Sequence, residues 1–123
     1  MNIIKVLQEV KMDINNKLHE MLKIINEKKF VSLKTIDISK ISSFCDYFII
    51  VSTDSMRQNN SMSDEFLDKL KESNIEPDRI EGMNTDWVLI DFGDIIVHFF
   101  TEEKHLFYNL EKVWADGTVL ENI

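Results

Sequence analysis

The sequence predicts a single α+β domain, a mixed αβ sandwich with about five strands in a mixed sheet and helices packed mainly on one face. Three observations predict this class. The chain opens with helical periodicity, short apolar runs bounded by turn residues follow, and 44% of its 123 residues are hydrophobic, enough for one core. We expect the domain to occupy residues 1–114 and residues 115–123 to form a loose tail.

The first predicted element is a helix over residues 3–25. Its apolar residues recur at spacings of three and four, so they share one stripe: Ile3, Leu7, Val10, Ile14, Leu18, Leu22 and Ile25. A first strand is expected over residues 30–36, and residues 37–44 should connect it to the next strand.

Residues 47–51 are apolar on both faces of an extended chain, which is typical of a central strand covered on both sides. A second helix should start after Ser55, because Ser55 and Gln58 have the spacing of a capping box. We expect it to end near Asn74, before Pro77. Its inward residues should be Met62, Phe66, Leu67 and Leu70.

A β-hairpin is the most informative predicted element. A short strand over residues 79–82 and a turn over 83–86 lead into strands 87–92 and 95–100, joined by the two-residue turn Gly93-Asp94. In that register one face is entirely apolar and should pack on helices: Val88, Ile90, Phe92, Ile95, Val97 and Phe99. The other face carries Trp87, Leu89, Asp91, Ile96, His98 and Phe100.

A last helix should begin after Thr101, whose hydroxyl can cap it, with Glu102 and Glu103 in its first turn. Its buried stripe should consist of Leu106, Phe107, Leu110, Val113 and Trp114.

The second face of the hairpin is too apolar for an ordinary solvated surface. One interpretation is a second core layer, covered by the first helix or by another element. The other is a partly open face, because an aromatic anchor flanked by apolar and a few polar groups is typical of contact with a protein partner. The same composition would suit a homodimer. The residues alone leave these alternatives open.

The charge distribution favours a basic protein partner. Residues 1–40 carry eight lysines and five acidic residues, a net charge of +3, whereas residues 41–123 carry six basic and seventeen acidic residues, a net charge of −11. Such an acidic body is repelled by phosphate backbones, so direct nucleic-acid binding is disfavoured. Complementary charge would speed association with a basic protein. The alternative is that the acidic excess only keeps the protein soluble.

Catalytic and metal-binding interpretations find little support. Asp91 and Asp94 are three positions apart, so they should not converge as a metal-binding pair. Cys45 is the only cysteine, and its acidic neighbour Asp46 should raise the pKa of its thiol, which makes a poor nucleophile. The three histidines fall on separate elements, and no phosphate-binding glycine motif occurs. We therefore predict no enzyme activity, no cofactor and no metal.

The compartment predicted by the sequence is a reducing cytoplasm. No apolar stretch approaches the length of a membrane span, and the N-terminus lacks the continuous apolar block of a signal peptide. A lone cysteine cannot form an internal disulfide.

Five ordered blocks carry a resemblance to a known family. They are residues 45–50 (CDYFII), 55–58 (SMRQ), 81–82 (EG), 87–98 (WVLIDFGDIIVH) and 107–114 (FYNLEKVW). In these blocks the chain resembles the ribosomal silencing factors, also called RsfS or Iojap, from its first helix to Trp114.

The resemblance implies a fold similar to nucleotidyltransferases without their catalytic acids. It also implies binding to the large ribosomal subunit through its protein number fourteen, which sterically blocks the small subunit and represses translation. On this basis we expect Trp87 to anchor the partner, within an apolar surround of Leu89, His98 and Phe100. Acid and hydroxyl contacts to the basic partner are expected from Asp46, Tyr47, Glu81, Asp91 and Asp94. The alternative is a non-catalytic nucleotide or small-molecule binding module on the same fold.

Overall fold

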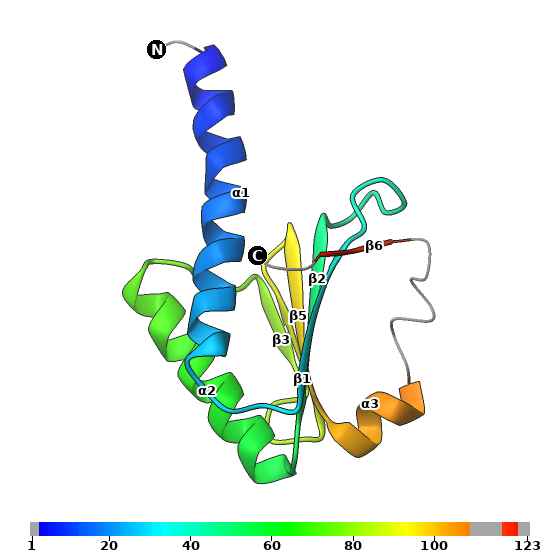
Figure 1. Ribbon diagram of the computed structural model, residues 1–123. Coiled ribbons are helices and arrows are strands. Elements are labelled where there is room, and N and C mark those ends of the chain that lie inside the picture. Colours follow the sequence, from blue (N-terminus) through cyan, green and yellow to red (C-terminus); the bar gives the residue numbers. More distant parts are fainter. Residues whose placement is uncertain (1–2, 109–116, 121–123) are drawn as a thin grey trace.

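The computed structural model describes residues 3–108 and 117–120, and the side chains of residues 14–105 and 117–120 (Figure 1). The elements are α1 (Ile3–Asn26), β1 (Ser32–Asp37), β2 (Tyr47–Thr53), α2 (Met56–Glu72), β3 (Arg79–Glu81), β4 (Trp87–Asp91), β5 (Ile95–Thr101), α3 (Glu102–Tyr108) and β6 (Thr118–Leu120). The strands form one sheet in the order β3-β4-β5-β2-β1-β6. Only the β2–β5 pair among these strands is parallel, so the predicted mixed sheet is confirmed.

The central position of β2 explains its apolar sequence. It lies between β1 and β5, and its side chains enter two separate cores. Ile49 and Val51 face α1 and α2, whereas Phe48 and Ile50 belong to a cluster on the opposite side of the sheet. The prediction of a strand covered on both faces is confirmed.

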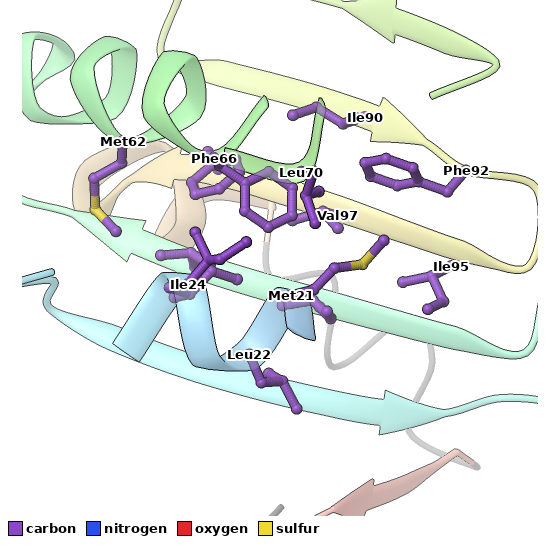
Figure 2. Packing of buried hydrophobic residues seen from close by; sticks show 14 of the residues in the cluster. Met21, Leu22, Ile24, Met62, Phe66, Leu70, Ile90, Phe92, Ile95 and Val97 are labelled. Carbon is purple, nitrogen blue, oxygen red and sulfur yellow. The ribbon is translucent and has the colours of Figure 1, made fainter. Parts of the chain in front are cut away.

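The larger core lies between the sheet and the helices α1 and α2, which cover the same face (Figures 1 and 2). We call it the helix-side core. Phe66 of α2 sits at its centre, with its ring edge-on to Phe99 at 5.3 Å and to Phe92 at 6.1 Å between centroids. Burial of each large apolar side chain here contributes about 1.5–3 kcal/mol. The predicted inward residues Met62 and Leu70 are buried in this core, and Leu67 packs against it while remaining partly exposed.

The hairpin of β4 and β5 adopts the predicted register. Val88 lies opposite Phe99 and Leu89 opposite His98, and the Phe92 N–H donates to the Ile95 carbonyl at 2.9 Å. The apolar face therefore enters the helix-side core, as predicted. The other face of the hairpin, with Trp87, Leu89 and Asp91, lies on the side of the sheet away from α1 and α2; we call it the second face.

Both predicted helix caps are present. The Ser55 hydroxyl accepts from the Gln58 N–H at 3.1 Å, while the Gln58 side chain accepts from the N–H of Asp54 at 2.8 Å instead of from Ser55 itself. The Thr101 hydroxyl accepts from the Lys104 N–H at 3.4 Å at the start of α3.

The strand count of about five was wrong by one. The additional strand, β6, pairs antiparallel with β1 and lies within residues 115–123, which were expected to form a loose tail. Three residues are too few to show a period, so no pattern of residues predicts β6. The first strand also begins at Ser32 rather than at residue 30. A domain boundary at residue 114 and a likeness to nucleotidyltransferases stay predictions.

Part of the predicted last helix falls outside the described residues. The chain is helical to Tyr108, but the stripe of Leu106, Phe107, Leu110, Val113 and Trp114 lies beyond the described side chains. Not all helices share one face: His105 of α3 contacts Ser52 and Phe100 on the second face, whereas α1 and α2 lie on the other.

Candidate docking surface on the second face of the sheet

A layer of stacked rings forms the centre of the second face. The Trp87 indole on β4 stacks on Phe100 of β5 at 4.9 Å between centroids, with 26° between the planes. Phe100 also stacks with His98 at 5.8 Å and with His105 at 5.6 Å. These residues meet because alternate positions of paired strands project to the same side.

Burial divides this layer in two. Phe100 is fully buried and His98 is 3% exposed, whereas Trp87 and Leu89 are only partly buried. For His98 and Phe100 the structure supports the interpretation as a second core layer, and their direct contact with a partner stays a prediction. They lie beneath Trp87 and support it.

The cover of this second core does not come from α1, which lies on the other side of the sheet. Among the described residues, Ile38 and Cys45 from the β1–β2 connection belong to the buried cluster, and His105 of α3 stacks on it. Short irregular segments therefore cover part of this face. Such segments have no helical periodicity, so the sequence pattern does not predict that they bury it.

A hydrogen bond fixes the direction of the Trp87 indole. Its Nε1 donates to Nδ1 of His98 at 3.1 Å, so Nδ1 must be unprotonated. Burial lowers the pKa of His98 to about 4, which keeps the ring neutral at physiological pH. Within the described part of the chain, the other ring nitrogen, Nε2, has no hydrogen-bond partner.

The turn before β4 sets the position of Trp87. Thr85 bonds through its hydroxyl to the carbonyls of Gly82 at 2.6 Å and of Trp87 at 3.0 Å. The fully buried Asn59 of α2 holds the same turn, since its amide donates to the carbonyls of Thr85 and of Phe99 at 3.1 and 3.0 Å. Trp87 is thus tied both to α2 and to the sheet beneath it.

Two of the predicted acidic contacts flank the indole on this face. Glu81 lies opposite Leu89, and Asp91 opposite Arg79, in the β3–β4 pair. Arg79 lies 3.5 Å from the Glu81 carboxylate and 3.6 Å from that of Asp91. The Asp91 carboxylate also accepts from the Gly93 N–H at 2.7 Å. Exposed ion pairs of this kind contribute little to stability, so these acids remain able to exchange partners.

Two other predicted contact residues turn away from Trp87. The Asp94 carboxylate lies 3.5 Å from Lys17 Nζ on α1, and Tyr47 packs against the helix-side core. Tyr47 alternates with Ile49 and Val51, so the same strand periodicity that predicts β2 places it on that face. Its contact with the same partner as Trp87 stays a prediction. Burial raises the pKa of the Tyr47 hydroxyl, and the nearby Asp37 and Asp46 raise it further.

Three acidic side chains lie near Cys45, and their charges affect its thiol. Its pKa is raised to about 12, chiefly by burial and then by the charges of Asp46, Asp91 and Asp94. These three carboxylates therefore lie around one end of the sheet, next to the hairpin turn. The prediction of a buried cysteine is confirmed, and Cys45 lies two residues before the start of β2.

The same end of the sheet exposes apolar side chains that sequence reasoning did not select. Ile41 and Phe44, in the β1–β2 connection, are 43% and 58% exposed. This connection reaches the hairpin turn, because the N–H of Asp46 donates to the Asp94 carbonyl at 2.8 Å. The sequence feature that could have indicated this exposed apolar surface is Phe44, an aromatic residue inside a polar connection.

None of the described helices is long and apolar enough to cross a bilayer. Within the described part of the chain, no three His, Cys, Asp or Glu side chains are grouped closely enough to hold a metal ion.

Comparisons with known proteins agree on one family. The family described as "Ribosomal silencing factor during starvation" matches residues 11–123. The ribosomal silencing factor RsfS of Zymomonas mobilis is 38% identical over 94 residues, 76% of this chain and 71% of that protein. RsfS of Halalkalibacterium halodurans is 35% identical over 98 residues, 79% of this chain and 84% of that protein. A crystal structure from Chromobacterium violaceum superposes with a TM-score of 0.77 at 26% identity, covering 82% of this chain and 85% of that one.

Proposed function

This chain belongs to the ribosomal silencing factor family, and from that premise we propose that it binds the large ribosomal subunit and sterically blocks the small one. The observation that carries the proposal is Trp87, a partly exposed indole held by Phe100, His98 and the turn from Gly82. A large side chain ordered in advance loses little entropy on binding, which is typical of an interface hot spot.

The proposed docking surface consists of Trp87 and Leu89, with the acids Glu81 and Asp91 beside them. Asp46 and the exposed Phe44 extend it toward the hairpin turn. An apolar centre with a charged rim is the usual anatomy of a protein interface. His98 and Phe100 act from beneath, by fixing the indole.

The proposed partner is a basic protein of the large subunit, the protein number fourteen implied by the family resemblance. The acidic rim supports a basic partner, because residues 41–123 carry a net charge of −11 from six basic and seventeen acidic residues. No chemical step is required: a protein seated where the subunits meet prevents joining by its volume. The proposed action is therefore non-enzymatic and cytoplasmic.

Nucleotide binding on this fold stays a prediction. The segment from Ser52 to Ser55, which leads into α2, contains no glycine, and the carboxylate of Asp54 stands there exposed. A negative charge at that position opposes a phosphate group.

The test is co-sedimentation of Trp87→Ala with purified large subunits. Loss of a hot-spot tryptophan costs about 2 kcal/mol of binding free energy or more, which is roughly a thirtyfold weaker affinity. Met56→Ala is the matched control, since Met56 is a large apolar residue, 48% exposed, at the start of α2 and outside the proposed surface. It should bind as the wild type does.

Subunit joining is the second readout. Wild-type protein and Met56→Ala should prevent small subunits from joining, and Trp87→Ala should not at the same concentration. Circular dichroism must show that Trp87→Ala is folded. Unchanged affinity of the folded variant would remove Trp87 from the interface.

A further inference from the structure

Strand β3 forms one edge of the sheet. Among the described strands it has a single neighbour, β4, and its three residues, Arg79, Ile80 and Glu81, are all exposed. A strand at an edge presents backbone N–H and C=O groups that can pair with an extended segment of another protein. In this mode of binding the main chain supplies affinity, and pockets for alternate side chains supply specificity.

An apolar groove lies beside this edge. Ile80 is 41% exposed and lies opposite Ile90, which is buried in the helix-side core, so Ile80 projects toward the α2 side of the sheet. A groove of about 240 Å³ lies between Ile80 and the end of α2. Its lining is Leu67, Asp68, Lys71, Ile75, Glu76, Pro77 and Ile80. Small-molecule sites usually have roughly 300–1,000 Å³, so this groove is better suited to a single apolar side chain.

The other two side chains of β3 connect this edge with the proposed docking surface. Arg79 lies opposite Asp91 and Glu81 opposite Leu89, so both project to the second face. Glu81 belongs to the proposed docking surface, and β4, the only described neighbour of β3, carries Trp87. A partner that is seated on Trp87 therefore reaches the edge of β3 directly, and the groove lies on the other side of the same strand.

The charge around the groove favours a basic segment. Residues 67–81 carry five acidic and three basic side chains, a net charge of −2. Two of the three bases, Lys69 and Arg79, already lie within 4 Å of carboxylates of this chain. The exposed carboxylates of Asp68 and Glu76 line the groove itself. Lysine or arginine side chains along a partner strand would complement these acids.

We propose that an extended, basic segment of the ribosomal partner adds a strand to β3 and places an apolar side chain in the groove beside Ile80. The inference rests on the proposed function, because it extends the interface from Trp87 across the edge of the sheet. The added strand continues the sheet beyond β3. Pairing along a strand also fixes the direction of the partner relative to the sheet.

The first test is photo-cross-linking to purified large subunits. A protein that carries p-benzoylphenylalanine in place of Ile80 should form an adduct with a subunit protein, and digestion should assign the adduct to a segment rich in lysine and arginine. Excess wild type should prevent it. The matched control carries the same group in place of Val31, which is 45% exposed and lies directly before β1. It should not give this adduct.

Affinity for large subunits, measured by co-sedimentation, is the second readout. Ile80→Lys should bind about tenfold more weakly than the wild type, because a like charge then opposes the basic segment. Val31→Lys adds the same charge to a similarly exposed apolar residue and should bind as the wild type does. Glu76→Lys reverses a charge of the groove lining outside β3 and should also weaken binding. It covers the case in which Ile80→Lys does not fold.

The outcomes separate this proposal from the proposed function. If Trp87→Ala loses affinity while the folded variants Ile80→Lys and Glu76→Lys bind as the wild type does, strand addition is wrong and docking through Trp87 stands. The absence of a protein adduct from position 80 would also overturn it, as would an adduct only with ribosomal RNA or with a second copy of this chain. A wild type that does not bind large subunits would remove both proposals.

Discussion

His98 determines how firmly Trp87 is held, because it is the acceptor of the indole N–H in a buried setting. The pKa of His98, lowered by burial to about 4, lies below the ordinary value of 6.5. Between these two pH values the unfolded chain binds a proton at this position and the folded chain does not. The stability contributed by the neutral His98 is therefore fully present above pH 6.5 and is lost as the pH falls toward 4.

We predict that His98→Gln weakens this pH dependence. Glutamine keeps an oxygen that can accept from Trp87 Nε1 but does not titrate. Between pH 7 and pH 4.5 the wild type should lose more free energy of unfolding than the variant, by an amount on the order of 2–3 kcal/mol. Urea unfolding at a series of pH values measures both slopes. Equal slopes would mean that His98 is already charged in the folded protein.

Residue-level placement shows where strand periodicity stops being informative. Tyr47 was expected to contact the same partner as Trp87, and the alternation along β2 puts Tyr47 on the opposite face of the sheet. Phe100 and His98 were placed correctly on the second face, but their burial depends on irregular segments and on α3. Strand periodicity predicts a face, whereas the accessibility of that face is a tertiary property.

At the scale of elements, the turn between β3 and β4 is the structure that places Trp87. Gly82 has a φ of 76°, and a Cβ added there would lie 2.1 Å from the Trp87 carbonyl oxygen. Gly93, in the hairpin turn, has a φ of 89°, but an added Cβ would meet only the Asp78 carboxylate at 3.1 Å. The two glycines share a left-handed conformation and differ in the space around them.

This contrast predicts unequal costs for the same substitution. Gly93→Ala should lower the free energy of unfolding by about 1 kcal/mol, the usual conformational penalty at positive φ. Gly82→Ala must also displace backbone, so its cost should exceed roughly 2–3 kcal/mol. Chemical denaturation of both variants measures the difference. Similar costs would show that the turn adjusts without strain.

Elements with a clear period were predictable, and short ones were not. The apolar stripe from Leu18 to Ile25 and the cap at Ser55 marked α1 and α2 because each rests on local spacing. The Gly93-Asp94 turn fixed the hairpin register for the same reason. The strand β6 has three residues and depends on pairing with β1, far away in the sequence, so local spacing contains no trace of it.

At the scale of the whole molecule, charge should govern recognition of the ribosome. The acidic rim around Trp87 predicts that affinity for large subunits falls, by about tenfold, as salt rises from roughly 50 to 300 mM. The paired variant Glu81→Gln with Asp91→Asn should show weaker binding at low salt and a shallower salt dependence. Co-sedimentation at several salt concentrations measures this slope. Salt-independent binding of the wild type would contradict an acidic docking surface.

The parallel pairing of β2 with β5 has a consequence for how the chain is made. Tyr47 pairs with Ile95, so β2 leaves the synthesising ribosome about 48 residues before its parallel neighbour β5 begins. Until then β2 has only one of its two strand neighbours, β1, while α1 and α2 are the elements that can cover its helix-side face. Such non-local pairing is slow, because a long loop must close first. The nascent chain is therefore most prone to misassociation at residues 47–53, and closure of β5 onto β2 is the step that ends this exposure.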